Sequence, residues 1–268
     1  MKKTLSLILL LVTIAPAAWG YRADYAPFEP GAAPKPFPVT ELKKLASESS
    51  DSQCTFAERP NSSPRIVFSW TPTDKRGDCT ISVIRPNGTK ILTGATIQAS
   101  SPKFITAVYS VLLNEDDKPD YVISEWSGGC GLAAEWCFLT FLLSNGDGYS
   151  VTQTSCMDCG KEDFVDLNKD GRAEFIHTSF VDGDSGKDGK YHNYWVFNIL
   201  QFKGTQIVSA NPLDHRFPGW VSYKFKPNHQ NTDQLTPEQR MRCWREAWTR
   251  WGGDPLMLGL EKEQGRTP

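Results

Sequence analysis

The chain has 268 residues, of which 39% are hydrophobic and 22% are charged, so it is long enough and apolar enough to bury a sizeable core. Its 29 basic and 31 acidic side chains give a formal net charge of −2 at pH 7, with no concentrated basic field of the kind that binds nucleic-acid phosphates. After residue 20 no apolar stretch is long enough to cross a bilayer, so we expect neither a nucleic-acid partner nor a membrane span.

The first 39 residues divide into two segments that precede the main domain. Residues 1–20 have the pattern of a secretory signal peptide, because Lys2 and Lys3 precede an apolar run over 5–18 and small residues precede Tyr21. We expect cleavage after Gly20 and a periplasmic or secreted location. Residues 21–39 are rich in proline and predict an extended, semi-rigid arm.

Residues 40–226 predict a mainly β domain. Its first ten residues are compatible with a short helix, but strand-like runs rich in β-branched and aromatic residues then occupy 65–70, 79–85 and 103–113. Between them, Pro86-Asn87-Gly88 predicts a hairpin turn.

The run 166–174 predicts a tight loop that binds calcium as a structural ion. Oxygen-bearing side chains stand at loop positions 1, 3, 5 and 9, and Gly171 permits a sharp turn between them. We assign this site to Asp166, Asn168, Asp170, Arg172 at position 7, and Glu174. An EF-hand is not expected, because position 12 is His177 and both flanks have the composition of short strands. The alternative is an acidic turn without an ion, since Asp, Asn and Gly are favoured in turns anyway.

A second copy of the loop lies 54 residues earlier, because residues 113–124 align with residues 167–178. This indicates an internal repeat of about 103–160 and 161–210. In the first copy Leu112 replaces the lead Asp and Asp117 replaces the Gly. Asn114, Asp116 and Asp120 could hold a weaker ion, although a plain turn is the preferred interpretation there.

Taken together, these motifs resemble the VCBS and FG-GAP repeats of secreted bacterial proteins. The resemblance covers residues 103–205 and includes the segment 120–129, which runs from a strand into Gly128-Gly129 and a Cys-containing aromatic strand. The first loop and the insertion 131–135 depart from the family pattern. The resemblance implies a calcium-stabilised β module and no particular reaction. Residues 65–225 have room for three units, so we expect an incomplete β-propeller or a sandwich of about three blade-like antiparallel sheets.

Seven cysteines in an exported chain are expected to form disulfides. We expect a Cys54–Cys79 bond and some pairing among Cys130, Cys137, Cys156 and Cys159, with one cysteine left over. Two alternatives are a redox dithiol at Cys156 and Cys159, and a zinc site made by four of the cysteines.

Residues 227–268 predict a C-terminal amphipathic helix followed by a tail. Residues 236–239 form a capping box, and Gly252-Gly253 would end the helix. An apolar stripe at helical spacing consists of Met241, Trp244, Trp248 and Trp251. We expect this stripe to dock on the β domain, and the alternative is an exposed helix that binds a partner.

The sequence contains no motif that specifies a catalytic site. There is no His-x-x-x-His pair and no Gly-x-Ser-x-Gly elbow, and we assign no catalytic residue. The first hypothesis is a non-enzymatic exported module that binds another protein. The alternatives are a structural envelope protein and a secreted hydrolase, for example of carbohydrate, with carboxylates such as Asp120, Glu125 and Glu135 assembled across sheets.

Overall fold

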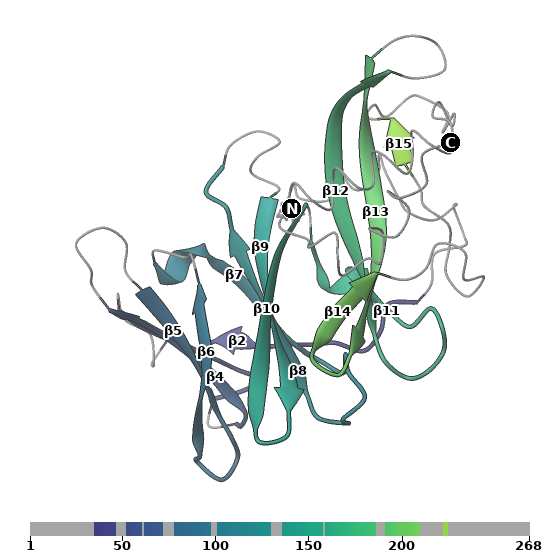
Figure 1. Cartoon of the computed structure of the whole chain (residues 1–268). Coiled ribbons are helices and arrows are strands. Elements are labelled where there is room, and N and C mark those ends of the chain that lie inside the picture. The colour runs from purple at the N-terminus through teal and green to yellow at the C-terminus, as the bar shows by residue number, and fades with distance from the viewer. Residues whose placement is uncertain are drawn as a thin grey trace, which may run out of the picture.

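The computed structural model describes residues 35–46, 52–60, 62–71, 78–97, 101–129, 136–157, 159–185, 191–209 and 222–224 (Figure 1). The predicted signal peptide, most of the Pro-rich arm and the predicted C-terminal helix lie outside these ranges, as do Cys130, Glu135 and Cys243. None of the helices in the described part is long and apolar enough to cross a membrane.

The described chain is mainly β and forms three antiparallel sheets, which confirms the predicted fold class at that level. The core of each sheet is a meander in which consecutive strands are neighbours. The first sheet contains β3 (Gln53–Ala57), β4 (Arg65–Thr71), β5 (Asp78–Ile84) and β6 (Lys90–Ile97). The middle sheet contains β7 (Ile105–Val111), β8 (Asp120–Trp126), β9 (Trp136–Asn145) and β10 (Gly148–Met157). The third sheet contains β11 (Phe164–Val165), β12 (Glu174–Ser185), β13 (Tyr191–Lys203) and β14 (Gln206–Ser209), and β15 (Ser222–Lys224) also pairs with β13.

A tight turn connects β5 to β6, as predicted for residues 86–88. The amide N–H of Gly88 donates to the carbonyl of Arg85 at 2.9 Å, and the side chain of Asn87 accepts from the N–H of Thr89 at 3.0 Å. Gly88 has φ of +80°, a value that glycine adopts without steric cost. Two 3-10 turns, Pro102–Phe104 and Lys161–Asp163, precede the first strands of the middle and third sheets.

The middle sheet is buried on both faces, because it lies between the other two. On β8, Tyr121 and Ile123 belong to the hydrophobic cluster shared with the first sheet, whereas Val122 belongs to the cluster shared with the third. On β9, Leu142 faces the first sheet and Phe141 faces the third. A strand that is buried on both sides needs apolar residues at odd and even positions alike, which explains the nearly continuous apolar run of residues 136–143.

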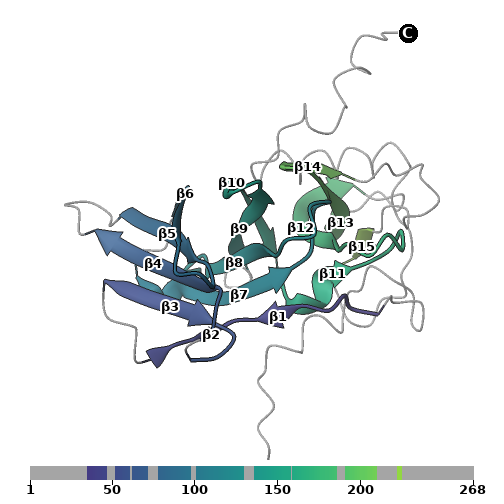
Figure 2. The ribbon, with the colours of Figure 1, turned by 90° about the horizontal axis from the view of Figure 1, so that it is seen from below.

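An N-terminal segment, residues 36–45, crosses all three sheets and pairs with the first strand of each (Figure 2). Pro36 bridges Val165 in the third sheet. Strand β1 (Thr40–Glu41) pairs with β7 in the middle sheet, and β2 (Lys43–Lys44) pairs with β3 in the first sheet. We call residues 36–45 the strap. The short helix predicted from residue 40 is therefore wrong over this part, because pairing with exposed strand edges overrides local helix propensity.

Candidate metal site in the repeated loops

The two predicted loops occupy equivalent places in neighbouring sheets. Residues 112–119 join β7 to β8, and residues 166–173 join β11 to β12. Gly171 is therefore flanked by strands, as predicted, and the loop is not an EF-hand. His177, the residue at position 12, is 0% exposed and lies within β12, away from the loop.

The two loops share three hydrogen bonds at the same offset of 54 residues that aligns their sequences. Each bond runs from a backbone N–H to a side-chain oxygen. In the first loop the bonds are Leu113 to Asp120 (2.8 Å), Asp116 to Asn114 (3.2 Å) and Lys118 to Asp116 (3.0 Å). In the second loop the corresponding bonds are Leu167 to Glu174 (2.7 Å), Asp170 to Asn168 (2.9 Å) and Arg172 to Asp170 (2.9 Å). Asp117 and Gly171, which also correspond, both have positive φ, of +57° and +83°. The repeat in the sequence is thus a repeat in backbone conformation.

The second loop is closed by its own acidic side chains. The two carboxylate oxygens of Asp166 accept the N–H groups of Asp170 and Gly171, each at 3.1 Å. The side-chain amide of Asn168 donates to the carboxylate of Asp170 at 2.8 Å. These bonds give the carboxylates of Asp166 and Asp170 partners within the turn itself.

The carboxyl group of Glu174 has a raised pKa in this loop. Its side chain is 3% exposed, and burial raises its pKa to about 7, with further contributions from the charges of Asp170 and Asp166. The hydrogen bond from the N–H of Leu167 opposes this rise. A cation in the loop would attract the negative charge of Glu174 and so favour its charged form.

The loop has the oxygen donors that calcium prefers, but it does not gather them around one centre. Among the described residues, no group of three or more His, Cys, Asp and Glu side chains is placed to hold a metal ion. The chemistry of the donor set therefore fits calcium, whereas the present placement of Asp166, Asp170 and Glu174 does not. Coordination would require these carboxylates to turn toward each other while keeping their backbone hydrogen bonds, for which each carboxylate has spare lone pairs.

The first loop is tied to the protein in a different way. Asp120 is 0% exposed, and its carboxylate accepts the N–H groups of Leu113, Asn114 and Ser144 at 2.8, 3.2 and 2.7 Å. Burial raises the pKa of Asp120, and these three bonds oppose the rise. Ser144 also donates its hydroxyl to Asp116 at 2.7 Å, and its carbonyl accepts from the side chain of Asn114 at 2.9 Å. These contacts favour the plain-turn interpretation, because Ser144 of β9 forms hydrogen bonds with Asp120, Asp116 and Asn114, the residues that an ion would need. The second carboxylate oxygen of Asp116, Oδ2, is buried and has no hydrogen-bond partner among the described atoms.

The two loops touch each other. Arg172 forms an ion pair with Asp117, and the N–H of Ala173 donates to the carbonyl of Leu112 at 3.0 Å. Beside this contact lies a hollow of about 240 Å³, and the polar residues that line it are Glu115, Asn168, Asp170, Arg172, Glu174, Gln201 and Lys203. We call this surface the loop face. We assigned Arg172 to the metal site as loop position 7. In the structure its side chain pairs with Asp117 of the other loop.

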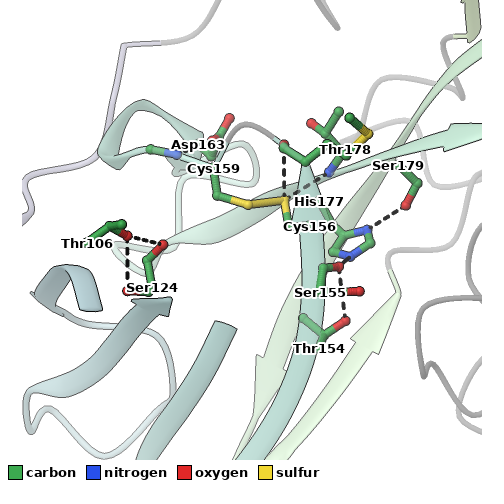
Figure 3. The surroundings of a disulfide bond; sticks show 12 residues. Thr106, Ser124, Thr154, Ser155, Cys156, Cys159, Asp163, His177, Thr178 and Ser179 are labelled. Atoms are coloured by element: carbon green, nitrogen blue, oxygen red, sulfur yellow. Dashed lines mark hydrogen bonds between the residues drawn. A yellow bond between two sulfur atoms is a disulfide. The ribbon is translucent and has the colours of Figure 1, made fainter. Parts of the chain in front are cut away.

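A disulfide lies at the end of the middle sheet, where the chain leads on to the third sheet (Figure 3). Cys156 at the end of β10 is bonded to Cys159, in the segment that leads to β11. The backbone N–H of Thr178 lies 3.5 Å from the sulfur of Cys156. This Cys-x-x-Cys pair is oxidised. A 3-10 turn follows it, so the pair lacks the helix N-terminus that would activate a redox thiol. The disulfide closes a short loop between β10 and the 3-10 turn Lys161–Asp163.

A buried polar group lies next to the disulfide. Nε2 of His177 donates to the carbonyl of Ser155 at 2.6 Å, and Nδ1 lies 3.5 Å from the hydroxyl of Ser179. Burial lowers the pKa of His177 to about 4, so the ring is neutral at physiological pH. Asn198 pairs with His177 across the sheet, and neither polar atom of its side chain has a hydrogen-bond partner within the described protein.

The other predicted cysteine pairs are corrected or untested. Cys54 and Cys79 are buried free thiols, so the predicted bond between them is wrong in this structure. They lie on β3 and β5 with β4 between them, and two interstrand spacings of about 4.8 Å exceed the reach of a disulfide. Burial raises the pKa of Cys54 to about 11, which makes the thiol unreactive. Cys137 lies directly opposite Cys156 in the ladder, but Cys130 is outside the described residues. The described cysteines form no zinc site.

The carboxylates considered for hydrolysis do not meet. Asp120 and Glu125 are five residues apart on β8, so alternation directs them to opposite faces of the middle sheet. Both are buried, at 0% and 1% exposure. No local sequence pattern could predict the contacts that Ser144 makes, because they join residues 24 to 30 positions apart.

Comparisons with protein-family models, with curated proteins and with solved structures found no match to this chain.

Proposed function

We propose that this chain is an exported, non-enzymatic β module that binds another protein through the loop face, with calcium as a structural ion in the loop 166–174. The observation that carries the proposal is the contact between the two repeated loops. The Arg172–Asp117 ion pair and the Ala173–Leu112 hydrogen bond join loops from two sheets into one polar surface beside a hollow. A surface assembled from loops on a rigid β scaffold is a frequent design for recognition.

The arrangement of the sheets supports a blade-like interpretation. Each sheet is built on a four-stranded meander, and successive sheets pack face to face in chain order. Blades of a β-propeller are related in this way, and the repeated loop occupies the first hairpin of two successive units. We therefore propose an incomplete propeller of the VCBS and FG-GAP type, in which the strap substitutes for ring closure as the element that joins the units.

Calcium would act on stability and on the shape of the loop face. Three carboxylates share the second loop, and burial, together with the charges of Asp170 and Asp166, raises the pKa of Glu174. A cation there would relieve this repulsion and hold Asp170 and Glu174, which also line the hollow. Millimolar calcium on a site of about 10 µM affinity would stabilise the folded state by about 2.7 kcal/mol. The ion would have no catalytic task in this proposal.

Export is supported by the leader-like residues 1–20 and by the Cys156–Cys159 disulfide, which is typical of oxidising compartments. The periplasm and the exterior of a bacterial cell are both oxidising, and both are rich in proteins to bind. We propose no hydrolase function, because the candidate carboxylates of the described residues lie on opposite faces of β8.

Quantitative mass spectrometry after affinity capture from envelope extracts tests the protein-binding proposal. We expect a partner that is recovered in stoichiometric amount with the wild-type chain and lost with the double variant Glu115→Lys and Lys203→Glu, which reverses two exposed charges of the loop face. The matched control is Glu41→Lys with Lys90→Glu, which reverses two exposed charges elsewhere and should retain the partner. Equal recovery with both double variants would show that the loop face is not the binding surface.

A further inference from the structure

The third sheet buries a face that the other sheets do not cover. On β12, Phe175 packs in the cluster shared with the middle sheet, and His177 reaches Ser155 of that sheet. Side chains alternate along a strand, so Ile176 and Thr178 point the opposite way. Cross-strand pairing puts Ile199 beside Ile176, and Val165 lies on the same side because its neighbour Phe164 faces the middle sheet. We call Val165, Ile176, Thr178 and Ile199 the outer face.

The outer face is enclosed although it belongs to the last layer. The exposed fractions of Val165, Ile176, Thr178 and Ile199 are 1%, 3%, 4% and 5%. None of the four belongs to either hydrophobic cluster formed between the described sheets, and no further sheet follows within the described ranges. Strand neighbours alone do not remove a sheet face from water, because side chains stand nearly perpendicular to the sheet. The described sheets therefore do not account for the burial of this face.

We infer that the C-terminal residues 227–268 cover the outer face, with Met241, Trp244, Trp248 and Trp251 packed on it. The chain enters this segment from β15, which pairs with β13 of the same sheet at Tyr194–Val196. The 44 residues after Lys224 therefore begin beside the face. Met241 and the three tryptophans recur at helical spacing, and each tryptophan can bury about 150–250 Å² of surface against a sheet.

Docking of the C-terminal stripe on the third sheet restricts where a partner can bind. A tryptophan stripe that is packed on the third sheet is not free to bind a partner, so partner binding is left to the loop face. The inference rests on burial and on chain direction, and it would stand even if the loop face bound nothing.

Site-specific photo-cross-linking in the full chain tests the inference. The diazirine analogue of leucine is introduced at position 176 or 199, where it nearly preserves side-chain volume, and cross-linked peptides are mapped by mass spectrometry. We expect intramolecular cross-links to peptides within 227–268. The same analogue at Leu92, which is 70% exposed on the first sheet, should give none to that segment.

Two full-length variants identify the side chains that dock. Replacement of Trp244, Trp248 and Trp251 by Ser should abolish the cross-links from position 176, whereas replacement of Arg242, Arg245 and Arg250 by Ser should retain them, because these arginines lie mostly off the stripe. The wild-type map decides the question even if the tryptophan variant does not fold. Cross-links from position 176 or 199 to residues 21–34 or 210–221, or to a second copy of the chain, would overturn the assignment.

Discussion

At the scale of single residues, the fold depends on buried polar side chains that have specific backbone partners. Asp120 accepts three backbone N–H groups, and His177 donates to the carbonyl of Ser155 at the contact between the middle and third sheets. A buried polar group with its partners costs little, whereas the same group without them costs about 1–3 kcal/mol. Asp120 and His177 therefore favour the one packing of the sheets in which their hydrogen bonds form.

The buried imidazole of His177 predicts a specific loss of stability in acid. Its pKa is lowered to about 4 in the folded protein, so its contribution is fully present above the unfolded value of about 6.5 and is lost as the pH falls toward 4. Since one pKa unit corresponds to about 1.4 kcal/mol, the loss should approach about 3 kcal/mol.

Urea unfolding of the wild type and of His177→Gln between pH 7 and pH 4 measures this contribution. The variant has no group that titrates at this position, so its unfolding free energy should fall less steeply, whatever its stability at pH 7. Parallel curves for the two proteins would mean that His177 does not cause the acid sensitivity.

At the scale of elements, the strap joins three sheets that otherwise contact only their neighbours. Leu42, between β1 and β2, is 5% exposed, packs in the cluster between the first and middle sheets, and donates its N–H to Val108 at 2.8 Å. Its neighbour Lys43 is exposed. Strand edges that lack a partner promote aggregation, so the strap both stabilises the sheets and covers their first strands.

Leu42→Ala should therefore lower the free energy of unfolding by about 3 kcal/mol, because it leaves a cavity between two sheets. Lys43→Ala should change it by less than about 0.5 kcal/mol. Both values come from equilibrium urea unfolding. Similar small effects for the two substitutions would indicate that the strap lies on the surface without contributing to the core.

The elements differ in how far the sequence alone could predict them. The apolar runs of β8 and β9 and the turn at residues 86–88 were recognisable because local composition determines them. The strap was not, since short polar segments such as Thr40–Glu41 and Lys43–Lys44 become strands only through pairing with distant edges. The conformation of the repeated loops followed from the 54-residue offset, whereas the contacts of Ser144 and the Arg172–Asp117 pair depend on how neighbouring hairpins meet in space.

At the scale of the whole molecule, three stacked sheets bring two copies of one loop together at one surface. The copies have diverged: the first is tied to Ser144 by hydrogen bonds, and the second keeps the acidic side chains of Asp166, Asp170 and Glu174. This divergence supplies an internal control, because an ion bound to the second loop should be insensitive to changes in the first. We propose that calcium binds the second loop and stabilises the module.

Thermal unfolding with 1 mM calcium and with EDTA, for the wild type, Asp166→Ala and Asp116→Ala, tests this claim most directly. A stabilisation of about 2.7 kcal/mol should raise the wild-type Tm by about 5–10 °C in calcium. Asp166→Ala should abolish the calcium response, and Asp116→Ala should preserve it at a lower Tm. A wild-type Tm that is the same in calcium and EDTA, or a calcium response that survives in Asp166→Ala, would contradict the account.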